Sequence, residues 1–204
     1  TYVLKKIIPA YKNLAAAIEE LKDSGSNKGG LCNYEDGKDY YEYLVRYSTG
    51  SSDSIKDLQK QVEQKRKEDL LQLSELLTKN PILAKESESY QLDTSDPSQI
   101  LAQLKETIKK DFPEAPDANF TIKYVDEALE DYLSPAFYLT SPIDDYKENS
   151  IYINEGSHYE KMKLFTTLAH EGFPGHLYQN VLANTTGLPS VRQLLNSSGY
   201  TEGW

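Results

Sequence analysis

The fold and chemistry of this sequence are inferred first from one stretch, His170-Glu171-Gly172-Phe173-Pro174-Gly175-His176. A histidine followed directly by a glutamate on a helix is typical of zinc hydrolases. In these enzymes the histidine binds the metal and the glutamate polarises a metal-bound water. In the standard H-E-x-x-H arrangement the second histidine comes four residues after the first. Here His176 comes six residues after His170, so the standard geometry does not apply directly.

The six-residue spacing is incompatible with an uninterrupted helix. Each residue turns an α-helix by about 100°, so six residues place His176 about 120° away from His170 around the axis. Pro174 lacks an amide hydrogen and interrupts helices, and Gly175 accepts unusual backbone dihedrals. We therefore expect a break at Phe173-Pro174-Gly175 that returns His176 to the same metal ion.

A third metal ligand is needed, because catalytic zinc usually takes three protein ligands and one water. Glu202 is the best candidate, since two histidines and one glutamate form a common catalytic set. The alternative for Glu202 is a first-turn glutamate that is stabilised by the helix dipole. Glu171, between the two histidines, is expected to be the general base, and its alternative is a solvated helix residue.

The motif and the residues after it match a family pattern. His170–His176, then Gln179, then Tyr200-Thr201-Glu202-Gly203-Trp204 fit H-E-x-x-P-G-H-x-x-Q followed by E-G-W. On these residues the chain resembles domain-of-unknown-function family 885 (DUF885), a bacterial group related to the zincin metallopeptidases. The resemblance implies a mostly helical, zincin-like fold with Zn2+ on His170, His176 and Glu202, and Glu171 as the base. It also implies that family members continue beyond the E-G-W segment.

Three further positions are candidates for the site. Gln179 either supports a metal ligand by a hydrogen bond or is a polar surface residue. Tyr200 either donates a hydrogen bond to the oxyanion that forms during hydrolysis or simply packs, as one of 16 tyrosines. By the resemblance to zincins, Ile151-Tyr152-Ile153 form an edge strand that binds an extended peptide through free backbone groups. The alternative is an ordinary strand of the sheet.

Two other groups of titratable residues lack a motif. His158 precedes the helix of the motif by about one turn and has no ligand-like spacing, so we assign it to a loop. Asp144-Asp145 is a carboxylate pair without a partner motif, and we assign it to a solvated loop. Neither group is expected to contribute to the metal site.

The rest of the chain predicts an α+β fold in which helices predominate. Helix formers fill 10–23, and a short helix rich in tyrosine is expected over 38–47. Apolar residues recur at three- and four-residue steps over 52–79 and 96–112. Short strands are predicted at 120–125, 136–139 and 151–153, and helices at 159–169 and 189–195. We expect a helical region over 1–113 and a zincin-like metal-site region over 114–204, with a small sheet beside the metal-binding helix.

The composition excludes some classes of protein. The net charge of −10 predicts no nucleic-acid partner, because phosphate contacts need a basic surface. No run of eighteen apolar residues occurs, so we expect no transmembrane segment. The acidic, tyrosine-rich composition with one cysteine favours an exported bacterial protein over a cytoplasmic one. Because Gly203-Trp204 directly follow an expected helix start, we expect the chain to be part of a longer protein.

The predicted function is metal-dependent hydrolysis of a peptide or small amide substrate, with Zn2+ as the cofactor. Peptide bonds are the expected target. One alternative is hydrolysis of a non-peptide amide or ester on the same site. The other is a non-catalytic helical binding or scaffold protein that retains the motif for structure. A groove with a free edge strand favours peptides, and a closed site with four protein ligands favours the structural role.

Overall fold

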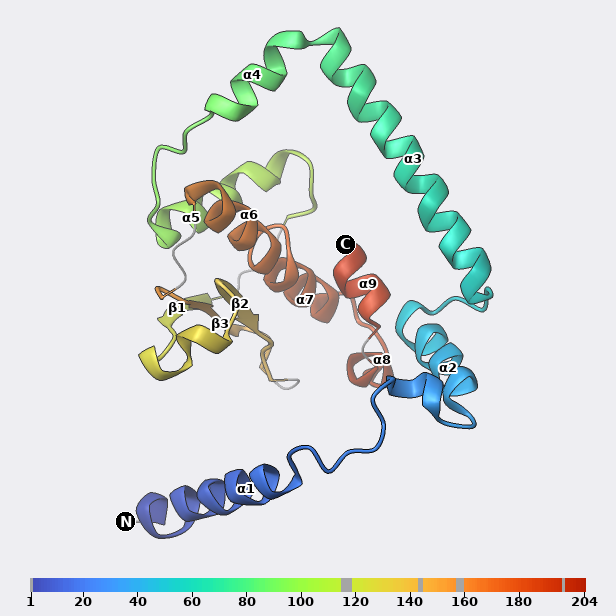
Figure 1. The fold of residues 1–204 in the computed structure, drawn as a ribbon. Coiled ribbons are helices and arrows are strands. Elements are labelled where there is room, and N and C mark those ends of the chain that lie inside the picture. Colours follow the sequence, from blue (N-terminus) through green and yellow to red (C-terminus); the bar gives the residue numbers. More distant parts are fainter. Residues whose placement is uncertain (1, 115–118, 143–144, 157–159, 196) are drawn as a thin grey trace.

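The computed structural model describes residues 2–114, 119–142, 145–156, 160–195 and 197–204. Its N-terminal part consists of helices, which are a π-helical segment (Val3–Ile7), α1 (Ile8–Leu21), a 3-10 turn (Gly30–Asn33), α2 (Gly37–Thr49), α3 (Ile55–Lys79) and α4 (Pro81–Ser89). Figure 1 shows α3 and α4 as an open arc that leads from α2 to α5 (Pro97–Thr107).

The predicted helices begin and end where local chemistry favours it. The Ser54 hydroxyl caps α3 by accepting a hydrogen bond from the Asp57 amide, and the Asp96 carboxylate caps α5 in the same way. Helix α2 ends at Gly50, whose φ of 69° is the left-handed conformation that glycine adopts easily. The expected stop at Asn80 is confirmed, but a further helix follows at once, because Pro81 occupies the first position of α4.

All three predicted strands form and belong to one sheet. They are β1 (Asn119–Tyr124), β2 (Ala136–Leu139) and β3 (Glu148–Ile153), and their order in space is β1-β3-β2. Strand β1 is parallel to β3, and β2 is antiparallel to it. Short 3-10 turns lie before β1 (Ile108–Lys110) and between β1 and β2 (Glu127–Tyr132).

The prediction that Ile151-Tyr152-Ile153 form an edge strand is wrong. These residues lie in β3, which is the central strand and pairs with β1 on one side and β2 on the other. A strand whose two edges are both paired cannot add a peptide strand. The alternation of residues in the sequence identifies a strand but carries no information on its place in the sheet. In the described sheet the edge strands are β1 and β2.

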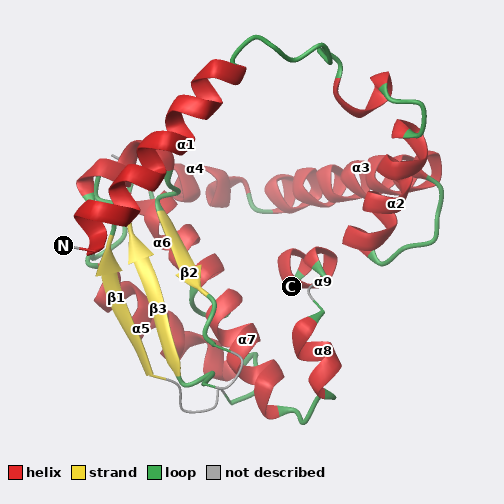
Figure 2. Cartoon of the chain, turned by 90° about the horizontal axis from the view of Figure 1, so that it is seen from below, coloured by secondary structure: helices red, strands yellow, loops and turns green. Residues whose placement is uncertain are grey.

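The hydrophobic core lies between one face of the sheet and the helices α5, α6 (Lys161–Glu171) and α7 (His176–Thr185). Figure 2 shows the three strands with α5 and α6 behind them. Leu101, Ile151, Leu168 and Leu177 have no exposed surface. Helix α5 belongs to the expected helical region 1–113, yet its buried residues are part of the same core as the sheet, α6 and α7. The core therefore includes residues from both sides of the expected boundary at residue 113. On the other face of the sheet, the rings of Phe137 and Tyr152 stack with centroids 5.1 Å apart.

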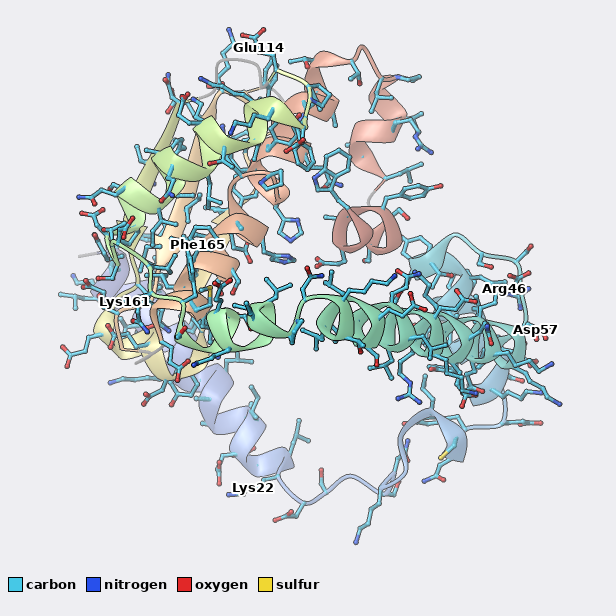
Figure 3. All side chains as sticks on the ribbon, turned by 90° about the horizontal axis from the view of Figure 1, so that it is seen from above. Lys22, Arg46, Asp57, Glu114, Lys161 and Phe165 are labelled. Carbon is cyan, nitrogen blue, oxygen red and sulfur yellow. The ribbon has the colours of Figure 1, made fainter. Side chains whose placement is uncertain are left out.

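The C-terminal residues form two short helices, α8 (Ser190–Leu194) and α9 (Ser198–Gly203). Figure 3 shows Lys22, directly after α1, and Asp57, on α3, far from the packed region that contains Phe165. Within the described part of the chain, no helix combines the length and apolar character needed to cross a bilayer.

Candidate metal centre

The expected helix break lies at the centre of the site. Helix α6 ends at Glu171 and α7 begins at His176, with a cis peptide between Phe173 and Pro174. The amide of Gly175 donates to the carbonyl of Ala169 over 3.0 Å, so the chain folds back across the end of α6. The prediction that Phe173-Pro174-Gly175 interrupt the helix is confirmed.

Gly175 is required by this close crossing. A Cβ atom at Gly175 would lie 1.7 Å from the carbonyl oxygen of His170. Gly172 is also confined, since its Cβ would lie 2.5 Å from the Leu101 side chain and 2.8 Å from the carbonyl oxygen of Leu168. A side chain at Gly175 would push α6 and α7 apart, and one at Gly172 would push α5 away from the end of α6, so Gly175 is the glycine that allows the two histidines to meet.

The break brings His170 and His176 together with Glu202. The two imidazole centroids lie 4.4 Å apart. The Nε2 atoms of His170 and His176 each lie 3.6 Å from an oxygen of the Glu202 carboxylate, the first from Oε2 and the second from Oε1. Ligand atoms about 2.1 Å from a tetrahedral zinc ion lie about 3.4 Å from one another. The donor set and its spacing therefore fit a zinc ion.

Glu171 is the second carboxylate of the site and has a different environment. Its Oε2 accepts a hydrogen bond from the backbone amide of Tyr138 over 2.8 Å, and its Oε1 lies 4.0 Å from His170 Nε2. His170, Glu171 and His176 also offer ligand atoms within 4.8 Å of one another, so Glu171 could be a metal ligand as well. Glu202 lies 3.6 Å from each imidazole, closer than the 4.0 Å between Glu171 and His170, which favours Glu202 as the third candidate ligand with Glu171 beside it.

Two hydrogen bonds hold α9, and with it Glu202, against the break. The indole Nε1 of Trp204 donates to the carbonyl oxygen of Pro174 over 2.7 Å. The Gln179 amide donates to the carbonyl oxygen of Tyr200 over 3.1 Å. This bond of Gln179 goes to the backbone of the helix that carries Glu202 and not to a candidate ligand, so the support expected for a metal ligand stays a prediction. Trp204 belongs to the E-G-W segment of the family pattern, which assigns no role to its indole.

Trp204 and Tyr178 also pack beside the metal position. The Tyr178 ring is buried between Phe112 and Trp204, and its hydroxyl donates to the carbonyl oxygen of Pro113 over 2.7 Å. Burial raises the pKa of the Tyr178 phenol above its usual value, which keeps the hydroxyl protonated as a donor. This cluster ties α7 and α9 to the chain that follows α5.

A cleft of about 560 Å3 opens beside the metal position. Its lining comes from β2 and the residues after it, from one face of α7, and from α8 and α9. Asn180 fixes the β2 side, because its side-chain amide donates to the Tyr138 hydroxyl over 2.9 Å and to the Ser141 hydroxyl over 3.1 Å. Reading the sequence missed Tyr138, Asn180 and Arg192 as cleft residues, since none of them belongs to a recognisable motif.

The remaining residues considered in the sequence are Tyr200, His158 and the Asp144-Asp145 pair. Tyr200 lines the cleft with a largely exposed side chain, and its contribution to oxyanion binding stays a prediction. His158 and Asp144 lie outside the described residues. Asp145 is exposed, and its carboxylate accepts a hydrogen bond from the Lys147 amide, as expected for a solvated loop.

Comparisons with known proteins give a family and a fold. The family model described as bacterial protein of unknown function (DUF885) matches residues 1–204. The fold is similar to the crystal structure of a candidate lipoprotein from Colwellia psychrerythraea, with a TM-score of 0.72 and 21% sequence identity. That likeness covers 99% of this chain and 38% of the Colwellia chain, and at this identity it concerns the fold alone. No functionally curated protein matches the sequence.

Proposed function

The chain belongs to the DUF885 family of bacterial proteins, and we propose that it is a zinc-dependent hydrolase of peptide bonds. The observation that carries the proposal is the convergence of His170 and His176 on the Glu202 carboxylate, at 3.6 Å each. Two imidazoles and one carboxylate are a common ligand set for catalytic zinc. Glu171 lies next to this set without being needed to complete it.

His170, His176 and Glu202 would hold the zinc ion. A zinc ion bound there would polarise the substrate carbonyl and lower the pKa of a water molecule. The side chains of His170 and Glu202 are 52% and 62% exposed, which leaves this position open to solvent and substrate. A closed structural metal site would have buried ligands, so the exposure supports a catalytic site over a structural one.

Glu171 would move the proton during hydrolysis. Its side chain is only 14% exposed, and the Tyr138 amide fixes one of its oxygens. The other oxygen is left on the side of His170, where it can accept a proton from the attacking water. The same carboxyl group can then pass that proton to the leaving amine, so the carbon–nitrogen bond breaks without releasing a free amide anion.

Strand β2 supports a peptide as the substrate. It is an edge strand whose Tyr138 amide is bound to Glu171, so a peptide would pair with the other outward backbone groups of β2. An extended peptide that pairs with this edge would lie next to Glu171 and the metal position. We also propose that the helices and sheet around the site form a zincin-like core. Hydrolysis of a non-peptide amide or ester in the same cleft is the alternative.

We further propose that the protein is exported. The Colwellia protein of similar fold is described as a candidate lipoprotein, which supports this location.

The proposal is tested by separating metal binding from catalysis. In Glu171→Gln the proton acceptor is lost while the three proposed ligands remain, so we expect hydrolysis of a fluorogenic peptide library to fall about 10²- to 10⁴-fold with zinc content unchanged. Glu63→Gln on α3 is the matched control and should leave the rate unchanged. A zinc-loaded protein that cleaves no library member, or a Glu171→Gln variant that is fully active, would contradict the proposal.

A further inference from the structure

The charge of the cleft is unusual for this chain. Although the protein contains 32 acidic and 22 basic residues, the described residues that line the cleft include one arginine, Arg192, and one carboxylate, Glu202. Glu202 is a ligand in the proposed metal site. Arg192 is therefore the fixed charge that a substrate would meet in the rest of the cleft.

Arg192 also differs from the other polar residues of the cleft in its interactions. The side-chain amides of Gln179, Asn180 and Asn184 already donate to protein oxygens. By contrast, no carboxylate of the described residues forms an ion pair with Arg192, whose side chain is exposed. A guanidinium group presents a planar fork of donors that matches a carboxylate, and it does not lose its charge. The feature of a substrate that Arg192 can recognise is thus an anionic oxygen group, and in a peptide substrate the group of this kind present in every chain is the C-terminal carboxylate.

The position of Arg192 along the cleft limits where that carboxylate lies. The cleft follows one face of α7 from His176 to Asn184, a distance of about 12 Å at 1.5 Å per residue. Helix α8, which carries Arg192, follows the end of α7 that is remote from His176 and leads back to α9 (Figure 2). An extended chain advances about 3.3–3.6 Å per residue, so a peptide that runs along this face of α7, about 12 Å, places about three residues there.

On these observations, and resting on the proposed hydrolase function, we propose that the substrates are peptides with a free C-terminal carboxylate that Arg192 binds. The enzyme then acts as a carboxypeptidase that releases one to three C-terminal residues. The hydroxyl of water adds to the carbonyl carbon of the scissile bond, and the carbon–nitrogen bond breaks. The leaving nitrogen takes a proton, so the products are a shortened peptide with a new carboxylate and a short fragment with a new amino group.

The test uses the zinc-loaded full protein and two peptides of identical sequence, one with a free C-terminal carboxylate and one with a C-terminal amide. A charged hydrogen bond contributes about 1.5–3 kcal/mol, so we expect kcat/KM for the amidated peptide to be about 10- to 150-fold lower. Mass spectrometry of the products should show loss of one to three C-terminal residues. Equal cleavage of both peptides, or cleavage only at internal bonds, would overturn the inference and leave the hydrolase standing. Cleavage of neither peptide would count against the proposed function itself.

A variant then assigns the discrimination to Arg192. In Arg192→Gln, kcat/KM for the free acid should fall to the value for the amidated peptide, and the value for the amidated peptide should stay unchanged. Arg66→Gln on α3, outside the cleft, is the matched control and should keep the wild-type preference. Because the readout is the ratio between two peptides, a general loss of folding cannot imitate it. An Arg192→Gln variant that still prefers the free acid would exclude Arg192 as the carboxylate site.

Discussion

The helices before residue 96 and the unit that begins at Pro97 differ in where their apolar side chains lie. On α1 and α3, residues such as Leu14 and Leu71 are more than half exposed, and among the residues described before Ile100 no hydrophobic side chain is buried. From Ile100 onward, leucines such as Leu168 and Leu177 are fully buried. The comparison teaches that the sheet with α5, α6 and α7 supplies the core that positions the proposed metal ligands.

The N-terminal helices are stabilised in a different way. Along α3, acidic and basic side chains pair four residues apart, as in Lys65–Asp69 and Glu75–Lys79, and these pairs are exposed. Exposed pairs of this kind contribute little to stability, because water and salt screen them. Caps and surface pairs thus stabilise α3 locally, whereas buried area stabilises the unit that holds the site.

The largest expected difference between the two regions comes from a leucine-to-alanine change in each. Leu168→Ala removes a fully buried side chain and should lower the free energy of unfolding by about 2–5 kcal/mol. Leu71→Ala, at a position that is 66% exposed, should change it by less than about 0.5 kcal/mol. Denaturant titration followed by circular dichroism measures both. Equal effects would mean that the two regions do not differ as described.

A smaller effect is expected from adding one methyl group to a glycine. In Gly175→Ala the new Cβ would lie 1.7 Å from the His170 carbonyl oxygen, so the break must open at a cost of about 1–3 kcal/mol. Zinc binding should weaken as well, because His176 follows the displaced residue. Gly25→Ala, whose Cβ would meet no atom within 4 Å, is the control in the N-terminal region. Unchanged stability and zinc binding in Gly175→Ala would show that the crossing is not needed.

The smallest effect concerns one hydroxyl group. Tyr178→Phe removes the hydrogen bond to the Pro113 carbonyl oxygen but keeps the buried ring, so we expect a loss of about 1 kcal/mol in the free energy of unfolding. Tyr132→Phe, at a position that is 82% exposed, should have no measurable effect. Thermal unfolding of both variants gives the comparison, and a larger loss in Tyr132→Phe would contradict it.

Local features of the fold could be predicted from the sequence. Pro174 and Gly175 predicted the helix break because their backbone limits act on their immediate neighbours. Asp96 and Ser54 marked helix starts for the same reason. The proximity of Glu202 to both histidines was also expected, from the common ligand set and from the family resemblance.

Features that depend on pairing between distant segments could not be predicted. The place of β3 in the centre of the sheet is set by its hydrogen bonds to β1 and β2, and its own sequence does not encode them. The bond from the Tyr138 amide to Glu171 uses the backbone, which any residue type supplies. Arg192 lines the cleft because the chain after α7 places α8 beside it. The three-dimensional structure shows this placement, and the residues around Arg192 in the sequence do not.

The most direct test of the account is the zinc content of the full protein, measured by elemental analysis beside His176→Ala and His158→Ala. We predict about one zinc ion per chain in the wild type, its loss in His176→Ala because one of three ligands is removed, and its retention in His158→Ala. That result would establish that the Pro-Gly break allows two histidines to bind one metal. A wild-type protein that takes up no zinc after incubation with the ion, or a His176→Ala variant that keeps it, would contradict the account.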